Sequence, residues 1–314
     1  MDATSAANIN QIALVSPVAC VNKDSHLRVY VLSNDGDVRE IQYEGRWTGG
    51  EAKNKVGAAK LTSPLAATSL GLDKIRVYGI AANNTVSEFC YDSGKAWYNG
   101  GLSGKFKVAA YSGVAAVFLS GKAVLRVYVQ GEDNNIQEYC YDNNDKGWTK
   151  GAGLGTALPG TAIAATTWFK DGKLGIRVYF QSPDLKVIEK CWDTGKGWYT
   201  GALTFAGCPP RAPLGVVSWD GPRIRVYYGT ADGRVREKAW DGGSGWYDGA
   251  FNQASVPGSR VAPCQGTDTS RVAALTVGGS NLRVYLQNGA MVSGFSEFAW
   301  SSGWKPAASP LPPN

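Results

Sequence analysis

The chain has 314 residues, with 32 Lys and Arg against 26 Asp and Glu and one His, which gives a formal net charge of +6. No run of five or six basic residues occurs, which argues against nucleic-acid binding by phosphate neutralisation, and a single His excludes a Cys/His zinc site. No stretch reaches the roughly 18 apolar residues that a membrane-spanning helix needs.

The N-terminus, Met1 to Asn10, carries no basic segment followed by an apolar stretch, so we expect no secretory signal peptide. The expected location is the cytoplasm, or the cell surface or outside the cell by an unconventional route.

One unit of the chain then repeats six times. Each copy holds an Arg-Val-Tyr string, a Glu and a Trp, and successive Arg residues lie 48, 50, 51, 48 and 58 positions apart. The sets are Arg28, Glu40 and Trp47; Arg76, Glu88 and Trp97; Arg126, Glu138 and Trp148; Arg177, Glu189 and Trp198; Arg225, Glu237 and Trp246; and Arg283, Glu297 and Trp304. A period near 50 built from short strands predicts an all-β, six-bladed β-propeller with one blade per repeat.

We therefore predict one domain over residues 1–314. Its blades are predicted at about 16–62, 63–111, 112–160, 161–212, 213–268 and 269–306. In the second unit, residues 64–69 are small and apolar, as suits an inner strand near the axis, and residues 74–80 and 85–92 read as a hairpin around a turn at 81–84. A short outer strand is expected within residues 94–101.

The two ends of the chain depart from this pattern. Residues 8–15 precede the first inner strand and form a candidate strand that closes the last blade. In the sixth unit, Val272-Ala273-Ala274 matches the inner-strand signature, so Ser259 to Gly266 is predicted to be a long connection. Two extra residues between Gly289 and Ser296 widen the Arg283–Glu297 turn.

The six Cys are predicted to be free thiols. Cys90, Cys140 and Cys191 recur two residues after the repeated Glu, and equivalent positions of neighbouring blades lie too far apart for a disulfide.

In each unit the Arg and the Glu flank a turn. Arg76 and Glu88 flank one centred near residue 82, so we expect them to lie roughly opposite each other on one face of the hairpin. One such pair is usually a cross-strand salt bridge, worth a few tenths of a kcal/mol. A salt bridge requires neither Arg rather than Lys nor an aromatic residue three positions after the Glu, yet every unit has both. These aromatics are Tyr43, Tyr91, Tyr141, Trp192, Trp240 and Trp300. Trp168 and Trp219 lie outside the sets and are predicted to be structural anchors.

The repeated set suits a sugar. A guanidinium donates to hydroxyls, a carboxylate accepts from them, and an aromatic ring packs on the C–H face of a pyranose. Six weak copies on one rigid ring would offset their weakness on a multivalent glycan.

The strings Leu27-Arg28-Val29-Tyr30 and Ile75-Arg76-Val77-Tyr78, together with the stretch from Tyr91 to Gly101, resemble the fungal fucose-specific lectins of the Aleuria aurantia lectin type. The resemblance covers about Val15 to Trp304. It implies multivalent binding of L-fucose and fucosylated glycans in up to six pockets between blades, with no metal or other cofactor, and a homodimer.

In each pocket the repeated Arg would donate to fucose, the Glu would accept from it, the Trp would form a wall of the pocket, and the aromatic after the Glu would pack near the methyl group. By the same resemblance, the Arg/Glu pair and the aromatic residues of one pocket can come from adjacent blades. Shorter Glu-to-Trp gaps in the first and sixth units predict pockets of different shape.

Two other classes of function share features with this pattern. A sialidase-like glycosidase needs two carboxylates of unequal pKa at one bond, whereas the Arg beside each repeated Glu is expected to lower the Glu pKa and make it a poor general acid. A protein-interaction propeller of the WD kind has Trp-Asp pairs, which occur here at Trp192-Asp193 and Trp240-Asp241 but without the Gly-His partner.

Overall fold

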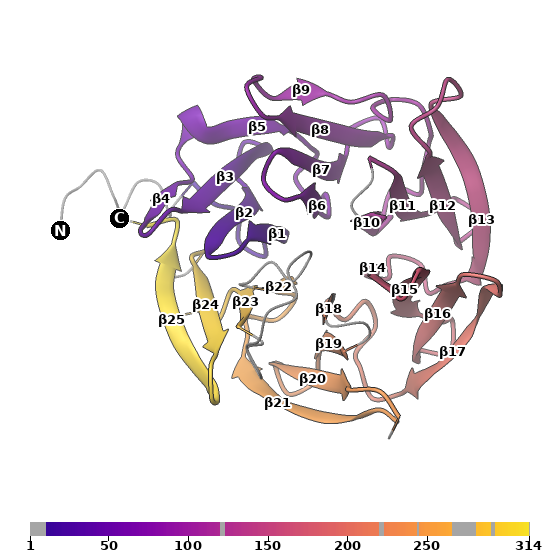
Figure 1. Cartoon of the computed structure of the whole chain (residues 1–314). Helices are drawn as coiled ribbons and strands as arrows, with labels where there is room; N and C mark the ends of the chain where they lie inside the picture. Colours follow the sequence, from indigo (N-terminus) through magenta and orange to yellow (C-terminus); the bar gives the residue numbers. More distant parts are fainter. Residues whose placement is uncertain are drawn as a thin grey trace.

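A computed structural model of the chain describes residues 11–119, 123–219, 223–243, 245–265, 281–289 and 293–313. Within these residues the strands form six antiparallel sheets arranged as blades around a central axis (Figure 1). The predicted all-β, six-bladed propeller is confirmed.

The strands follow one another from the axis outwards in each blade, with one extra strand in the first. Blade 1 contains β1 (Val18–Lys23), β2 (His26–Leu32), β3 (Asp37–Tyr43), β4 (Trp47–Gly49), the 3-10 helix η1 (Ala52–Asn54) and β5 (Lys55–Ala58), which pairs with β3. Blade 2 contains β6 (Ala66–Leu70), β7 (Lys74–Ile80), β8 (Val86–Asp92) and β9 (Tyr98–Asn99). Blade 3 contains β10 (Val114–Phe118), β11 (Leu125–Gln130), β12 (Asn135–Tyr141) and β13 (Trp148–Thr156).

The other three blades have four strands each. Blade 4 contains β14 (Ala164–Lys170), β15 (Lys173–Gln181), β16 (Val187–Asp193) and β17 (Gly197–Phe205). Blade 5 contains β18 (Leu214–Trp219), β19 (Arg223–Gly229), β20 (Arg234–Trp240) and β21 (Tyr247–Ala254). Blade 6 contains β22 (Val261–Gln265), β23 (Leu282–Leu286), β24 (Phe295–Trp300) and β25 (Trp304–Leu311).

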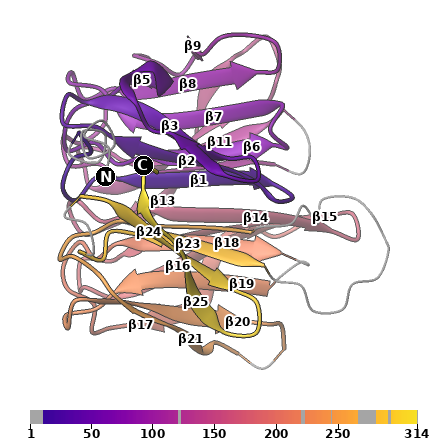
Figure 2. The ribbon, with the colours of Figure 1, turned by 90° about the vertical axis from the view of Figure 1, so that its left-hand side faces the viewer.

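Each blade is strongly twisted. Figure 1 shows the inner strands nearly end-on around the axis and outer strands such as β13 and β17 lengthwise along the rim. The side view in Figure 2 shows the inner strands running along the axis. Such a twist is the normal right-handed coiling of β-strands, and it makes the faces of neighbouring blades meet at an angle that side chains must fill.

The hydrophobic core lies between blades. Six clusters of buried residues are found, and each combines side chains from two neighbouring sheets. Between blades 1 and 2, for example, Val21 and Tyr30 pack against Ile75, Val77 and Phe89. Any site at the outer end of a blade junction is therefore supported by a rigid, apolar core.

Two predictions about the ends of the chain are wrong. The inner strand of blade 6 is β22, so residues 261–265 of the predicted connection form a strand, and the fifth blade ends before Val261. The predicted inner strand Val272-Ala273-Ala274 lies outside the described residues. The last blade also extends beyond residue 306, to the end of β25 at Leu311.

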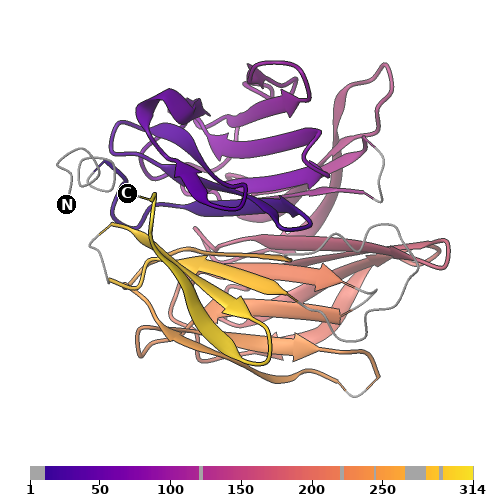
Figure 3. The same cartoon turned by 60° about the vertical axis from the view of Figure 1, so that its left-hand side comes forward.

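Within the described residues, no strand is exchanged between the first and the last blade. In the described part of the candidate closing strand, Ile12 bridges Ser33 of blade 1, and no strand of residues 11–15 joins the last sheet. The segment contacts blade 6 through a hydrogen bond from Gln287 Nε2 to the Ala13 carbonyl at 3.2 Å, and Ile12 belongs to the hydrophobic cluster that contains Tyr285 and Phe295. The C-terminal end of β25 lies beside blade 1 (Figure 3), where Pro312 packs close to Gly50.

Candidate ligand-binding sites

The repeated Arg and Glu lie diagonally across the central hairpin of each blade. In blade 2, Glu88 is opposite Tyr78, and Arg76 is opposite Cys90. The same offset of two residues occurs in the other five blades. The Arg and Glu are therefore offset by one residue pair of the same face, and both point to one face, as predicted, because residues two apart on a strand share a face.

The Tyr of the Arg-Val-Tyr string holds the Glu. All six of these Tyr are almost completely buried, and in five blades the phenol donates a hydrogen bond to the carboxylate. The distances are 2.9 Å for Tyr30–Glu40, Tyr78–Glu88 and Tyr179–Glu189, and 3.0 Å for Tyr128–Glu138 and Tyr285–Glu297. A phenol fixed in the core thus sets the position of each carboxylate.

The backbone of the outer strand supplies a second support for the Glu. The amide N–H of Leu102 donates to Glu88 Oε2 at 3.0 Å, and that of Ala152 donates to Glu138 Oε2 at 3.2 Å. A glycine leaves room for the carboxylate here, since a Cβ on Gly100 would lie 2.1 Å from Glu88 Oε2. Gly151, Gly201 and Gly249 do the same for the Glu of blades 3, 4 and 5.

The repeated Trp packs against the preceding blade and not against its own Arg and Glu. Trp148 of blade 3 meets Tyr78 of blade 2 edge-on, with ring centroids 6.4 Å apart. The other five junctions have the same edge-on contact, and the ring closes with Trp47 of blade 1 against Tyr285 of blade 6. Arg76 and Trp97 therefore belong to different sites.

Six candidate sites result, each numbered by the blade that supplies its Arg and Glu. They are site 1 (Arg28, Glu40, Tyr91, Trp97), site 2 (Arg76, Glu88, Tyr141, Trp148), site 3 (Arg126, Glu138, Trp192, Trp198), site 4 (Arg177, Glu189, Trp240, Trp246), site 5 (Arg225, Glu237, Trp300, Trp304) and site 6 (Arg283, Glu297, Tyr43, Trp47). The short Glu-to-Trp gaps of the first and sixth units consequently affect sites 6 and 5.

Each Arg is held by a backbone carbonyl and by a second polar side chain. Its Nη1 donates to the carbonyl of the preceding residue in every blade, at 2.8–3.1 Å. In sites 1 to 5 an acid pairs with the guanidinium: Glu44 at 2.6 Å from Arg28, Asp92 at 3.0 Å from Arg76, Asp142 at 2.8 Å from Arg126, Asp193 at 2.9 Å from Arg177 and Asp241 at 2.9 Å from Arg225. In site 6 the partner is Asn281.

The Arg side chains remain 12–22% exposed, whereas the Glu in sites 3 to 6 are only 5–8% exposed. The Arg Nε–Glu Oε1 distances are 3.9 Å in site 3, 3.7 Å in site 4, 3.0 Å in site 5 and 3.2 Å in site 6. The set therefore presents a solvent-reachable cation above a buried anion, with aromatic rings of the next blade at one side.

Sites 4 and 5 carry extra aromatic contacts. The guanidinium of Arg177 lies 4.5 Å from the Trp168 ring, and that of Arg225 lies 5.0 Å from the Trp219 ring. These two Trp are thus more than anchors of their blades: they stack on the Arg and fix its plane. The corresponding residue in blade 2 is Leu70, which has no such surface.

Burial decides the charge state of the carboxylates. It raises the pKa of Glu40, Glu88 and Glu297, and it raises the pKa of Glu237 to about 7, against the opposing effect of the neighbouring Arg. The expectation that the Arg lowers the Glu pKa is therefore wrong for these four, because loss of hydration outweighs the ion pair. The second acid behaves oppositely: although partial burial raises it, hydrogen bonds from Tyr98 and Arg76 bring the pKa of Asp92 to about 2.

The thiols next to these sites are structural. Cys20, Cys90, Cys140, Cys191 and Cys208 are free, as predicted, and the side chain of Cys264 lies outside the described residues. Burial, followed by the charge of the neighbouring Glu, raises the pKa of Cys90, Cys140 and Cys191 to about 12. They stay protonated at neutral pH and behave as small apolar groups.

Two kinds of site residue were missed in the sequence. The supporting Tyr was visible as the last letter of Arg-Val-Tyr, and the second acid as the residue after Tyr43, Tyr91, Tyr141, Trp192 and Trp240. The Trp-Asp pairs that suggested a WD repeat are in fact this aromatic and this acid. Both residues recur at fixed positions in the repeat, and this recurrence was the signal that could have identified them.

Among the residues that the structure describes, no group of three His, Cys, Asp or Glu could hold a metal ion. The same residues include no helix with the length and apolarity of a membrane span.

Fold and sites together define a propeller with repeated polar and aromatic pockets at its blade junctions. The chain matches the family model described as fungal fucose-specific lectin over residues 12–314. It is 41% identical over 311 residues to the fucose-specific lectin of Aspergillus fumigatus, covering 96% of this chain and 98% of that protein. The chain belongs to the fungal fucose-specific lectin family, which confirms the resemblance seen in its motifs.

Solved structures agree with this membership. SapL1 lectin, in complex with alpha methyl fucoside, superposes with a TM-score of 0.89 at 48% identity, covering 98% of this chain and 100% of that one. A mutant of Aleuria aurantia lectin in complex with Fucα1-6GlcNAc superposes with a TM-score of 0.79 at 30% identity, covering 95% and 96%.

Proposed function

We propose that this protein is a lectin that binds L-fucose and fucosylated glycans in up to six pockets, each between two neighbouring blades. The observation that carries the proposal is the sixfold repetition of one arrangement: a partly exposed Arg near a Glu that is buried in five blades and partly buried in the first, beside two aromatic rings of the next blade. The relatives named above bind fucosides in their solved complexes, and this supports fucose as the sugar. They are named as lectins, so the chain is a binding protein and not an enzyme.

The chemistry of one site suits a deoxyhexose. In site 5, four of the five N–H groups of Arg225 have partners: Nε lies 3.0 Å from Glu237 Oε1, Nη2 lies 2.9 Å from Asp241 Oδ1, and Nη1 donates to two backbone carbonyls. One guanidinium hydrogen is thus left for a hydroxyl of a sugar, above a carboxylate that is only 5% exposed. Trp300 and Trp304, tilted against each other with centroids 5.6 Å apart, form an apolar corner for a methyl group and the C–H face.

The rigid support explains how a shallow site can bind at all. Because Tyr hydroxyls and backbone amides already hold the carboxylates, little side-chain freedom is lost when a sugar arrives. Each site is nevertheless small, so strong binding to a cell surface or glycoprotein would come from engaging several sites at once. A homodimer would double their number. Dimer formation, and the place where the protein acts, stay predictions of the sequence.

The assignment of aromatics to the preceding blade gives a sharp test. In the double variant Arg28→Ala/Trp97→Ala both changes fall in site 1, so calorimetry with methyl α-L-fucoside should show one site lost. In Arg76→Ala/Trp97→Ala the changes fall in sites 2 and 1, so two sites should be lost. Equal losses in the two variants would contradict the arrangement, and wild-type protein that is not retained on immobilised fucose would contradict the function. Turnover of a chromogenic fucoside would favour a glycosidase.

A further inference from the structure

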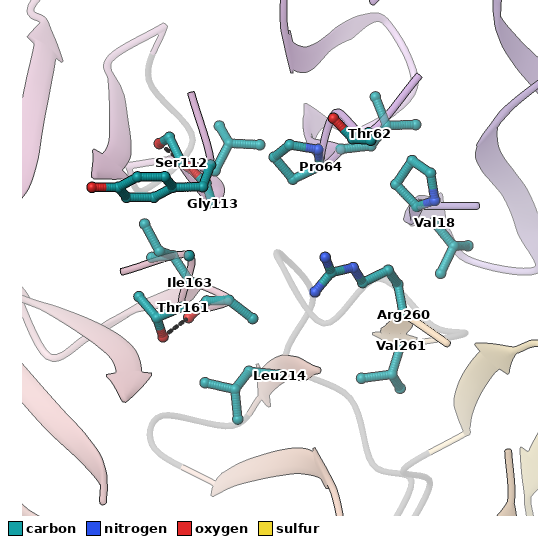
Figure 4. A pocket seen from close by; sticks show the side chains of 16 residues that line it. Val18, Thr62, Pro64, Ser112, Gly113, Thr161, Ile163, Leu214, Arg260 and Val261 are labelled. Carbon is teal, nitrogen blue, oxygen red and sulfur yellow. Dashed lines mark hydrogen bonds between the residues drawn. The ribbon is translucent and has the colours of Figure 1, made fainter. Parts of the chain in front are cut away.

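A cavity of about 80 Å³ lies on the ring axis, at the end where the inner strands begin (Figure 4). Every blade contributes to its wall, through Val18, Leu65, Val114, Ile163, Leu214 and Val261. It is remote from the Arg–Glu sites. Arg76 pairs with Thr68, four residues further along the inner strand than Pro64 at the cavity wall, which is about 13 Å at 3.3 Å per residue.

Among the described residues that line this cavity, Arg260 is the one that carries a charge. It directly precedes β22, and Figure 4 shows its side chain extending from the Val261 backbone into the space between the blades. The other five blades have Pro17, Pro64, Gly113, Ala162 and Pro213 at the equivalent position. The five small residues thus leave space for the cavity. The long side chain of Arg260 places a positive charge in it.

Nothing in the described part of the chain neutralises this charge. The Arg260 guanidinium forms no hydrogen bond or ion pair there, and no carboxylate lines the cavity. Two of the hydroxyls that line the cavity are engaged elsewhere, since Ser112 donates to the Gly113 carbonyl at 2.6 Å and Thr161 donates to the Ala162 carbonyl at 2.8 Å. Burial lowers the pKa of Arg260 from its usual 12.5, although the group stays a cation at neutral pH.

The surrounding loops add to the positive potential. The six segments that lead into the inner strands (11–17, 59–64, 107–113, 157–162, 207–213 and 254–260) contain Lys60, Lys107, Arg211 and Arg260 and no Asp or Glu. Of the acids on the hairpin turns at this end of the ring, Asp37, Asp184 and Asp232 already have basic partners, at 2.7 Å from Lys55, 2.8 Å from Lys186 and 2.7 Å from Arg236. A buried cation without a counter-charge is costly, and an anion from solvent removes that cost.

We propose that the axial cavity is a binding site for a small inorganic anion, a halide or a tetrahedral oxyanion, held by the Arg260 guanidinium. The volume is room for such an ion with one or more waters. A charge-assisted hydrogen bond to guanidinium is the expected contact. The site is distinct from the fucose pockets in place and in ligand. Because the anion would bind only the closed ring, it would stabilise the folded protein by mass action.

Chloride-35 NMR linewidths measure the proposed binding directly. The full-length protein would be compared with Arg260→Met and with the control Arg234→Met, whose guanidinium is also half-buried but bonded to the Asn252 carbonyl at 2.8 Å. Methyl α-L-fucoside would be present to occupy the arginines of the outer sites. We expect excess broadening in the wild type and in Arg234→Met, and loss of most of it in Arg260→Met. Equal broadening in all three proteins would overturn the proposal.

Competition identifies the kind of anion. Phosphate that removes the broadening at lower concentration than bromide would indicate an oxyanion site, and the reverse order would indicate a halide site. If Arg260→Met does not fold, wild-type crystals soaked in bromide decide the matter. Anomalous density within hydrogen-bond reach of the Arg260 guanidinium supports the proposal, and a cavity without such density refutes it.

Discussion

Replacing Gly201 by Ala should abolish site 4 while leaving the other sites intact. A Cβ at this position would lie 2.1 Å from Glu189 Oε2, 2.5 Å from its Cδ and 2.6 Å from Cys191 Sγ. Such approaches are more than 0.5 Å inside normal contact, so the carboxylate must move. It would then leave the Leu203 amide, now at 3.3 Å, and the Tyr179 hydroxyl, now at 2.9 Å.

The expected size of the effect follows from the bonds that depend on this carboxylate. Hydrogen bonds to a charged group contribute about 1.5–3 kcal/mol each. If fucose donates two hydroxyls to Glu189, their loss weakens site 4 by about 3–6 kcal/mol, or at least about 100-fold. Overpacking should cost the fold only about 1–3 kcal/mol. Binding at one site should therefore vanish while the protein stays folded.

Calorimetry with methyl α-L-fucoside measures the result as a stoichiometry one lower than that of the wild type, with the remaining affinities unchanged. Gly153→Ala is a matched control, because a Cβ at Gly153 meets nothing within 4 Å and the variant should bind like the wild type. A Gly201→Ala protein with unchanged stoichiometry and affinity would refute the idea that the buried Glu is the acceptor for the sugar.

Three further outcomes are expected. Arg177→Ala should lose one site and keep its fold, and a calorimetric stoichiometry equal to that of the wild type would contradict this. Glu237, with a pKa of about 7 when folded against 4.5 when unfolded, contributes stability that is complete below pH 4.5 and lost as the pH rises through 7. Because fucose favours the ionised carboxylate, affinity at site 5 should fall as the pH drops from 8 to 6, and titrations showing tighter binding at pH 6 would rule this out. EDTA should leave haemagglutination unchanged, and its loss would point to a metal that the described residues do not suggest.

The exact pairing register within each hairpin could not be predicted from the repeat in the sequence. Placing the turn of blade 2 at residue 82 made Arg76 and Glu88 opposite each other, but the paired residues are centred on 83. The difference arises because Asn84 takes a left-handed conformation, with φ of 60°, and the turn closes between Ala81 and Thr85. A shift of the turn centre by one residue changes every cross-strand partner by two residues, and Tyr78 thereby becomes the partner of Glu88.

The sixth inner strand was misplaced for a different reason. Val272-Ala273-Ala274 has the expected apolar pattern, whereas β22 contains Pro263, and a Pro normally argues against a strand inside a sheet. The innermost strand of a blade is an edge strand, however, with a partner on one side only. A Pro whose missing N–H faces the axis costs no ladder bond there, so the composition rule does not apply.

Building each pocket from two blades links binding to closure of the ring. Site 6 joins Arg283 and Glu297 of the last blade to Trp47 of the first, whose ring meets Tyr285 with centroids 6.0 Å apart. No strand is shared between these two blades in the described residues, so their junction is held by side-chain packing and by contacts such as Pro312 against Gly50. Sites 1 to 5 lie between blades that are consecutive in the chain. Any loosening of the ring between its ends would therefore remove site 6 first and leave the others formed.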